Sequence, residues 1–469
     1  MKENGTDVKT EVIAGLTTFM TMAYIIALNP NLLTGFTANG GQELWNAVFL
    51  ATCIASAFGT ILMAFIANKP FAMSAGMGLN SFFAVVVANI ATIAGVSYLE
   101  GFRAGLCIIL IEGIVFIILS ALNVREKIVQ AIPLGVRLGI SPAIGLMLLN
   151  IGFGSNAGVY SETGGPFYAM ANFFGSLTAS YAKDTMGSGY SVMVLTVITM
   201  FVGLFTIVAL DHKKVKGSVL YGILTGSVIY WAGEYFVLHI NPFASLATAS
   251  WLPPFKDMAA LTLFKFDFNV LKSLGMFTVV TLVLTFCIID MFDTIGTLVG
   301  TASRANMLDE NGNMPNMKEA LLSDACGTVC GALTGTSTIT TFVESASGVE
   351  AGGRTGLTSL VTGLIFLACM FISPIAAIIP AAATSSALIY VGILMLQGLK
   401  NIDFDDISVC VPVFIMLVAM PISGSIGHGI GLGLIAYTII KFITGKAKEV
   451  SPLTLVLSIL FLVKFFFAF

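Results

Sequence analysis

The sequence AFGT at residues 57–60 returns as ACGT at residues 325–328, each time inside a long apolar stretch. Continuing both segments in the same register places residues 71–80 opposite residues 339–348. Both of these stretches are rich in small residues, and neither has a helical pattern. The identities are few, so chance is a competing explanation. Their common order along the chain nevertheless predicts two related halves.

The whole chain has the composition of a membrane protein. Hydrophobic residues make up 57% of its 469 positions and charged residues 10%, whereas the outer shell of a soluble domain must be polar. A bilayer core of about 30 Å needs about 20 apolar residues per helix. The apolar runs lie at 12–30, 45–67, 76–93, 103–122, 132–152, 190–210, 217–237, 274–298, 318–334, 343–352, 355–378, 382–399, 405–423 and 425–444, with a further run at 452–469. The sequence predicts an all-α integral membrane protein of fourteen spans, whose first span is a retained helix and not a removable signal.

Seven predicted spans in each half is an odd number, so the two halves must insert with opposite orientations. A third match, Ile-Pro at residues 132–133 and again at 379–380, supports the duplication. Secondary transporters use such inverted repeats, and broken helices from both halves form the binding site near the bilayer midplane. Glycines such as Gly76 and Gly348 would permit sharp turns in the two small-residue stretches. The alternative is that these glycines only allow close helix packing.

The charged and sulfur-containing residues exclude several classes of function. Placing the N-terminus in the cytoplasm assigns thirteen Lys and Arg residues to inside loops and five to outside loops, as the positive-inside rule expects. The net charge of −3 gives no support for a nucleic-acid partner. The seven cysteines and three histidines form no metal-ligand cluster, so neither a metal nor a cofactor is expected. The sequence has no P-loop or nucleophile elbow, which argues against an ATP-driven pump and against an enzyme.

Acidic side chains inside the predicted spans are candidates for function, because an unpaired charge in the hydrocarbon region is unfavourable. Asp290 and Asp293 lie three residues apart on one helix face, and Glu344 lies in the second small-residue stretch. A planar heterocycle needs acceptors for its ring N–H groups and donors for its carbonyl oxygen, and Asn80 could supply donors. An acid shielded from water can hold a proton near neutral pH. We hypothesise that one carboxyl binds a base while another carries a driving proton. Two further acids are interpreted as hydrogen-bonding links between helices: Glu112 and Asp324.

Four motifs together resemble one known family. They are GLTTFMTMAY at residues 15–24, GMGLN at 76–80, FDTIGT at 292–297 and TFVES at 341–345. The chain resembles the AzgA-like branch of the nucleobase–cation symporter-2 (nucleobase/ascorbate transporter) family, the purine permeases for hypoxanthine, guanine and adenine. The motifs cover nearly the whole chain in order, and their combination is specific.

The resemblance implies a fold and a set of site residues. The fold would be a seven-plus-seven inverted repeat in which spans three and ten each pair a short strand with a short helix. The implied domains are a core domain (11–122 and 270–378) and a gate domain (123–240 and 379–445). A C-terminal apolar segment (446–469) follows the fourteen spans and is not part of this fold. The implied proton-coupling residues are Asp293 and Glu344. The implied substrate-binding residues are Gly78, Asn80, Phe342, Val343, Glu344 and Ser345, with Asp290, Thr294 and Thr341 in secondary roles.

The expected function is a proton-coupled symporter of the cell membrane that imports purine bases by alternating access. The expected partners are a purine base, a proton and the lipid bilayer, and the resemblance makes a homodimer plausible. The sequence does not decide which purine is preferred or which acid carries the proton. An anion transporter or exchanger of the same architecture is the main alternative, but its site would need a cation where this chain has acids. A channel is a further alternative.

Overall fold

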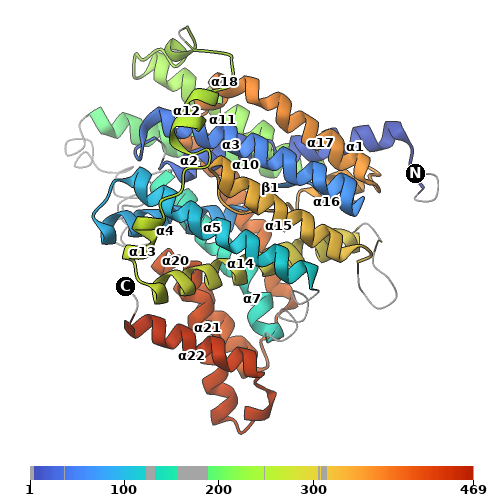
Figure 1. Cartoon of the computed structure of the whole chain (residues 1–469). Coiled ribbons are helices and arrows are strands. Elements are labelled where there is room, and N and C mark those ends of the chain that lie inside the picture. Colours follow the sequence, from blue (N-terminus) through green and yellow to red (C-terminus); the bar gives the residue numbers. More distant parts are fainter. Residues whose placement is uncertain are drawn as a thin grey trace.

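The computed structural model describes residues 5–35, 37–122, 133–156, 188–247, 249–304, 307 and 314–467. Within these residues, ten helices are long and apolar enough to cross a membrane, which confirms the prediction of a helical, multi-pass membrane protein. Residues 123–132 and 157–187 of the predicted gate domain, including Ile132, lie outside the described ranges. Figure 1 shows the helices, and in the described residues two short strands form one sheet.

The elements follow the predicted runs closely. The first half comprises α1 (Val8–Met22), α2 (Ile25–Leu33), α3 (Gly41–Leu62), η2 (Met63–Ala67), β1 (Met73–Ala75), α4 (Met77–Ala94), α5 (Tyr98–Ala121), α7 (Leu134–Ile151), η3 (Gly152–Asn156), α10 (Ser188–His212) and α11 (Ser218–Phe236). Between the halves lie η4 (Ala244–Ala247), α12 (Phe255–Leu261) and α13 (Phe268–Ser273). The second half comprises α14 (Met276–Arg304), α15 (Met317–Thr334), β2 (Ile339–Thr341), α16 (Ser345–Glu350), α17 (Gly356–Ala368), η5 (Cys369–Ile372), α18 (Ser373–Ala377), α19 (Ala381–Leu396), η6 (Gln397–Asn401), α20 (Ile407–Ser423) and α21 (Ile426–Ile443). The chain then continues through η7 (Ala447–Glu449) to α22 (Pro452–Phe467).

The two halves meet with the symmetry of an inverted repeat. β1 and β2 pair antiparallel, and the pairing is centred on Ser74 opposite Thr340. The repeated glycines lie back to back, because a Cβ on Gly59 would stand 3.5 Å from the Cα of Gly327 and the reverse distance is 3.4 Å. Equivalent positions that contact each other are expected beside a pseudo-two-fold axis. The inverted repeat is therefore confirmed.

The structure corrects the register of the repeat by two residues. The Thr60 hydroxyl bonds to the backbone of Met73, thirteen residues later. The equivalent Thr328 hydroxyl donates to the carbonyl of Ile339, eleven residues later. Met73 is thus the counterpart of Ile339, whereas the continued register had paired Phe71 with Ile339. The turn from helix to strand is two residues shorter in the second half, and this difference leaves no periodic signal in the sequence.

The two helices that follow the strands differ in length. α16 has six residues, as expected for a short helix, but α4 has eighteen and is long enough to be a candidate span by itself. The prediction of a short helix in span three was therefore wrong. The helix continues because its residues after Asn80 are mostly apolar and include no Gly or Pro until Gly95, which ends the helix in the left-handed conformation with φ +64°. In the second half, Gly352 (φ +102°) soon ends α16.

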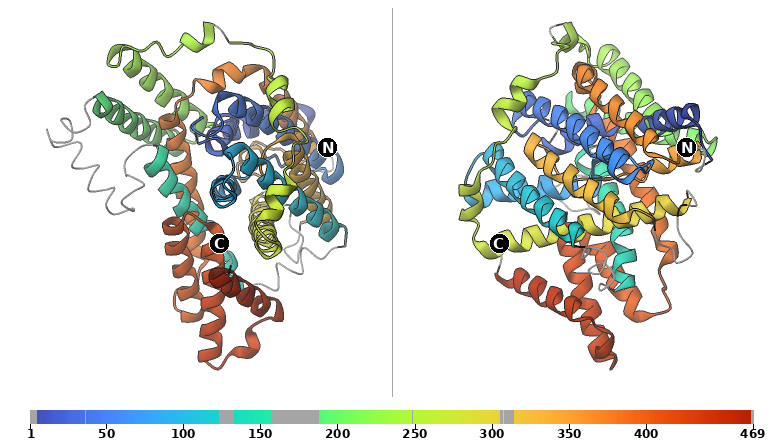
Figure 2. Two further views of the ribbon diagram at one scale, coloured as in Figure 1. Left: turned by 60° about the vertical axis from the view of Figure 1, so that its left-hand side comes forward. Right: turned by 45° about the vertical axis from the view of Figure 1, so that its right-hand side comes forward.

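The helices pack in two groups. In one group α3 contacts α15 and α17, α1 contacts α17, and α5 contacts α4 and α15. In the other group α7 contacts α19 and α20, α20 contacts α21, and α10 and α11 contact α19. The left panel of Figure 2 shows α7 and the red C-terminal helices gathered on one side of the blue and gold helices. α14 contacts members of both groups, including α5 and α21.

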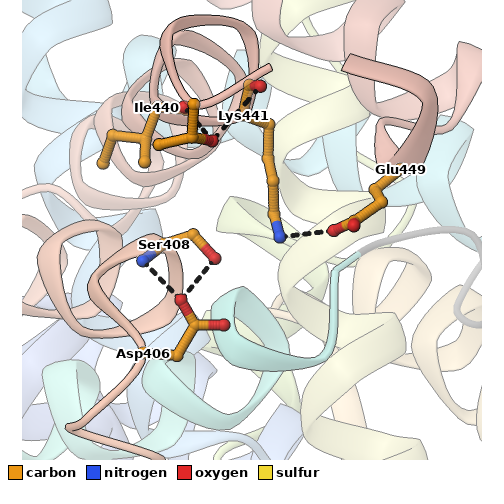
Figure 3. Close-up of polar contacts among 6 residues, drawn as sticks. Asp406, Ser408, Ile440, Lys441 and Glu449 are labelled. Carbon is orange, nitrogen blue, oxygen red and sulfur yellow. Dashed lines mark hydrogen bonds and ion pairs between the residues drawn. The ribbon is translucent and has the colours of Figure 1, made fainter. Parts of the chain in front are cut away.

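The placement of the run at 452–469 was left open by the sequence. Its residues 452–467 form the helix α22, which packs against α21 and α14. Thr438 and Ser458 join α21 and α22 through their hydroxyls, 2.8 Å apart. Figure 3 shows the nearby ion pair, in which Lys441 Nζ lies 2.6 Å from Glu449 Oε2. The hydrogen bond from Lys441 lowers the pKa of Glu449. In the same figure Asp406 accepts hydrogen bonds from Ser408 at the start of α20.

Candidate functional site

The backbones of the two broken segments bind each other around the strand pair. The Gly76 amide donates to the carbonyl of Thr338 at 3.2 Å, and the Phe342 amide donates to the carbonyl of Ala72 at 3.0 Å. The Ser345 hydroxyl accepts from the Ala72 amide at 2.9 Å. Because strands expose backbone groups that need partners, the two segments can exist inside a membrane protein only by pairing. This pairing fixes the start of α4 beside the start of α16.

Asp293 and Glu344 come together beside the strand pair. A Cβ on Gly76 would lie 3.5 Å from Asp293 Oδ2, so this carboxylate lies against the turn between β1 and α4. The carboxylates of Asp324 and Glu344 are close enough to Asp293 to interact with it electrostatically. The side chains of Asp293 and Glu344 are each half-buried. Both acids belong to the second half of the chain, and the first half contributes the backbone that faces them.

Glu344 is held by the break in the first span. Between α1 and α2, the Tyr24 hydroxyl donates to Glu344 Oε1 at 2.6 Å. One turn earlier, the Thr21 hydroxyl donates to the Glu344 carbonyl at 3.4 Å. Tyr24 is buried. Sequence analysis placed Tyr24 in a family motif but gave it no role, because its partner lies 320 residues away.

Asn80 ties the first broken segment to the second. Its side chain is fully buried in the first turns of α4. Its amide nitrogen donates to the carbonyl of Ala75 at 3.1 Å, and its amide oxygen accepts a short hydrogen bond from the Ser337 hydroxyl. The amide keeps a second N–H, since each Asn nitrogen carries two hydrogens. Asn80 therefore braces the strand pair and can still donate a hydrogen bond.

Gly78 faces the other group of helices. A Cβ on Gly78 would lie 2.8 Å from Ile144 Cγ2 on α7 and 3.6 Å from Ile426 Cδ1 on α21. The start of α4 and these helices are thus in direct contact, and only a glycine fits at this position without movement. Sequence analysis missed both isoleucines, because an apolar residue in an apolar span carries no signal of its own.

Thr294 links the acids of α14 and α15. Its hydroxyl oxygen lies 3.1 Å from Asp290 Oδ1, 3.0 Å from Asp324 Oδ1 and 2.7 Å from the Thr340 hydroxyl. All four side chains are buried. A hydroxyl has a single hydrogen, so Thr294 can donate to only one of its three neighbours at a time. Asp324 thus takes part in a hydrogen-bonded link between helices, as its interpretation from the sequence expected.

The remaining candidate residues have different environments. Thr341 and Phe342 are buried in and beside β2. The Val343 side chain is 47% exposed. Glu112, on α5, accepts a hydrogen bond from the Thr338 hydroxyl at 2.9 Å. This bond connects α5 to the segment before β2, in agreement with the helix-linking interpretation.

Comparisons with known proteins agree with the resemblance. The sequence profile of a permease family matches residues 9–427. The chain is 36% identical to the adenine permease AdeP of Escherichia coli, over all of this chain and 95% of that protein. It is also 36% identical to the guanine/hypoxanthine permease PbuO of Bacillus subtilis, over 99% of each chain.

A solved structure shares the fold. The transmembrane domain of the bicarbonate transporter BicA from a cyanobacterium superimposes with a TM-score of 0.62 over 90% of this chain and 97% of that one, at 14% sequence identity. A likeness at this identity shows the architecture alone. The family match and the relatives of equal length show that the chain is a transporter and not an enzyme. The chain belongs to the permease family, and within it to the nucleobase/ascorbate transporters that its motifs resemble.

Proposed function

We propose that this chain is a proton-coupled symporter that imports purine bases. The relatives that share 36% of its residues over essentially the whole chain are permeases for adenine and for guanine/hypoxanthine. The observation that carries the proposal is the meeting of Asp293 and Glu344 beside the turn before α4. Two half-buried carboxylates at paired broken helices suit a ligand rich in N–H groups together with a proton.

The base would bind between the starts of α4 and α16. Glu344 would accept a hydrogen bond from a ring N–H through Oε2, because Oε1 already receives the Tyr24 hydroxyl. The first amides of α4 around Gly78, the free N–H of Asn80 and the backbone of residues 342–345 would orient the ring. Donors and acceptors would thus meet the opposite edges of one planar molecule.

The proton would bind at Asp293. Two charged carboxylates close together in a site shielded from water are unfavourable, so a proton on one of them stabilises the site. Asp293 lies near both Asp324 and Glu344, so a negative charge on Asp293 would be repelled by the negative charges of these two carboxylates. On these observations alone Glu344 could exchange roles with Asp293. In either case, one proton would enter with each neutral base.

Transport would follow from movement of the core domain against the gate domain, which would expose the site to each side in turn. The proposed domains keep the bounds 11–122 and 270–378 for the core, and 123–240 and 379–445 for the gate. The contact of Gly78 with Ile144 lies between them and would open as the domains move. The location in the cell membrane, the cytoplasmic N-terminus and a homodimer remain predictions.

An anion exchanger is a weaker alternative. Its support is the shared architecture with a bicarbonate transporter, which at 14% identity carries no information about the substrate. An anion would need a cation or free donors at the site, whereas here it would approach the carboxylates of Asp293 and Glu344. The electrostatics of the described residues therefore favour a neutral or protonated ligand.

Uptake of labelled hypoxanthine tests the proposal. The chain is produced in cells that lack their own purine permeases, and uptake is measured across external pH. We expect saturable uptake that falls at least tenfold in Asp293→Ala and Glu344→Ala. Glu350→Ala, which removes an exposed acid six residues after Glu344, is the matched control and should transport normally. Normal uptake with unchanged pH dependence in both site variants would show the assigned mechanism to be wrong.

A further inference from the structure

Tyr24 lies where the first span contacts the carboxylate of Glu344, the acid of span ten. The helix breaks between Met22 and Ile25, and the break places the Tyr24 ring in the hydrophobic core with 3% of its surface exposed. A buried phenol needs a partner for its hydroxyl. That partner is a carboxylate oxygen of Glu344, and no other hydrogen bond to this side chain occurs in the described residues.

The hydrogen bond has the length of a charge-assisted one. The distance of 2.6 Å between the Tyr24 hydroxyl and Glu344 Oε1 falls within the range for an O–H donor and an ionised carboxylate. The Thr21 hydroxyl bonds to the backbone of the same residue, so Glu344 is held at both its side chain and its main chain. A donor to the charged form stabilises that form. The contact therefore favours an ionised Glu344 with a fixed direction.

Asp293 lacks such a donor in the described part of the chain. Among the residues that the structure describes, no donor lies within hydrogen-bonding distance of its carboxylate, and its electrostatic partners are the like charges of Asp324 and Glu344. Both effects favour the protonated form of a carboxyl group. The sequence alone does not decide which of the two acids carries the proton. The hydrogen bond from the Tyr24 hydroxyl distinguishes them, because only Glu344 receives it.

We propose that Tyr24 is a positioning residue that keeps Glu344 ionised and aimed at the purine, and so leaves the transported proton to Asp293. The inference rests on the proposed function, and it adds the residue that decides between the two roles. Tyr24 does not contact the base in this account. It acts through Glu344 alone.

The other charged groups around Glu344 do not replace Tyr24. The elements that pack on α16 and β2 bring acids, and the Arg354 side chain donates to the carbonyls of Val349 and Gly353 at the far end of α16. Among the described side chains, the acids on these elements are Glu11 on α1, Glu43 on α3, Asp290 and Asp293 on α14, Glu319 and Asp324 on α15 and Glu350 on α16 itself, and the cations are Lys9 on α1 and Lys318 on α15. Of these, Glu11 is engaged at the start of α17.

Purine binding by the purified protein as a function of pH tests the inference. In Tyr24→Phe we expect the Kd for hypoxanthine at neutral pH to rise about tenfold or more, the effect of one hydrogen bond to a charged group. Without its donor Glu344 takes up a proton more readily. The loss of binding on the acid side should therefore begin about one pH unit higher than in the wild type. Tyr98→Phe is the matched control, because its hydroxyl donates to the carbonyl of Leu33 away from the acids, and its pH profile should be unchanged.

Two outcomes would overturn the inference. One is a Tyr24→Phe protein that binds with the wild-type Kd and pH profile. The other is a Kd raised by the same factor at every pH, which is the result of a structural role only. Glu344→Gln gives a second test should Tyr24→Phe not fold, because an amide cannot ionise. Its weaker binding should no longer depend on acid pH, and a persisting acid-side loss would contradict the role of Glu344. Absence of purine binding by the wild type would instead refute the proposed function itself.

Discussion

Glu11 is expected to be among the most important single side chains for stability in the first span. It is fully buried, although it lies in the first turn of α1. Its Oε1 accepts from the amides of Arg354 and Thr355 at 2.9 and 3.1 Å, and its Oε2 accepts from the amide and hydroxyl of Thr358 at 3.2 and 2.5 Å. The carboxylate thus binds the amides that are left free at the start of α17, where the helix dipole favours a negative charge. It joins α1 to a helix nearly 350 residues away in the sequence.

The magnitude follows from these contacts. Glu11→Gln keeps the size of the side chain but replaces one acceptor oxygen by an NH2 group. That NH2 group would face two hydrogen-bond donors of the protein and could accept from neither. A hydrogen bond to a charged group contributes about 1.5–3 kcal/mol, so losing two of them costs about 3 kcal/mol or more. An unfolding entropy of about 2 cal/mol/K per residue then gives a fall in Tm of at least about 3 °C for a chain of this length.

Thermal unfolding of the purified protein in detergent, followed by a thiol-reactive dye, measures this effect. The buried cysteines report the opening of the helical bundle. Asp7→Asn is the control, since it removes the same charge from the exposed N-cap of α1 and Asn is an equally good cap. We expect the control to change the Tm by less than about 1 °C. Equal melting temperatures for Glu11→Gln and the wild type would refute the argument from the buried carboxylate.

Two further variants test the site. Gly78→Ala places a methyl group 2.8 Å from Ile144 Cγ2, so we expect hypoxanthine uptake to fall at least tenfold. Uptake should recover in part when Ile144→Ala is added. Normal uptake by the single variant would show that α4 and α7 do not touch here. Thr294→Val removes the hydroxyl between Asp290 and Asp324, and we expect a loss of about 2 kcal/mol in stability, because buried carboxylates lose a donor. Thr301→Val on the same helix is its control, because in the described part of the chain the buried Thr301 hydroxyl has no partner. Equal loss in both valine variants would contradict a special role for Thr294.

Much of the architecture can be predicted from the sequence. The repeated tetrapeptides end in Gly59-Thr60 and Gly327-Thr328, and the structure places these glycines back to back because close helix packing needs small residues. The apolar runs predict the helices because the bilayer fixes the length of a span. The two-residue error in the strand register and the length of α4 could not be foreseen in this way. Both depend on loop geometry, and a loop leaves no periodic pattern.

The site is predictable to a smaller extent. Acids in apolar spans draw attention to Asp293 and Glu344 because of the free energy of burying a charge. Tyr24 and Ile144 could not be found by the same reasoning, since a tyrosine or isoleucine is ordinary in an apolar helix. Their relevance comes from contacts between distant segments, which a single sequence does not contain.

The central claim is that a purine base and a proton cross the membrane together through this chain. Proteoliposomes that contain the purified protein and a trapped pH-sensitive dye test it directly. An inward hypoxanthine gradient with no initial pH difference should acidify the interior of wild-type liposomes, and Asp293→Asn liposomes should show no acidification. Hypoxanthine entry without acidification in the wild type, or equal acidification in the variant, would contradict the account.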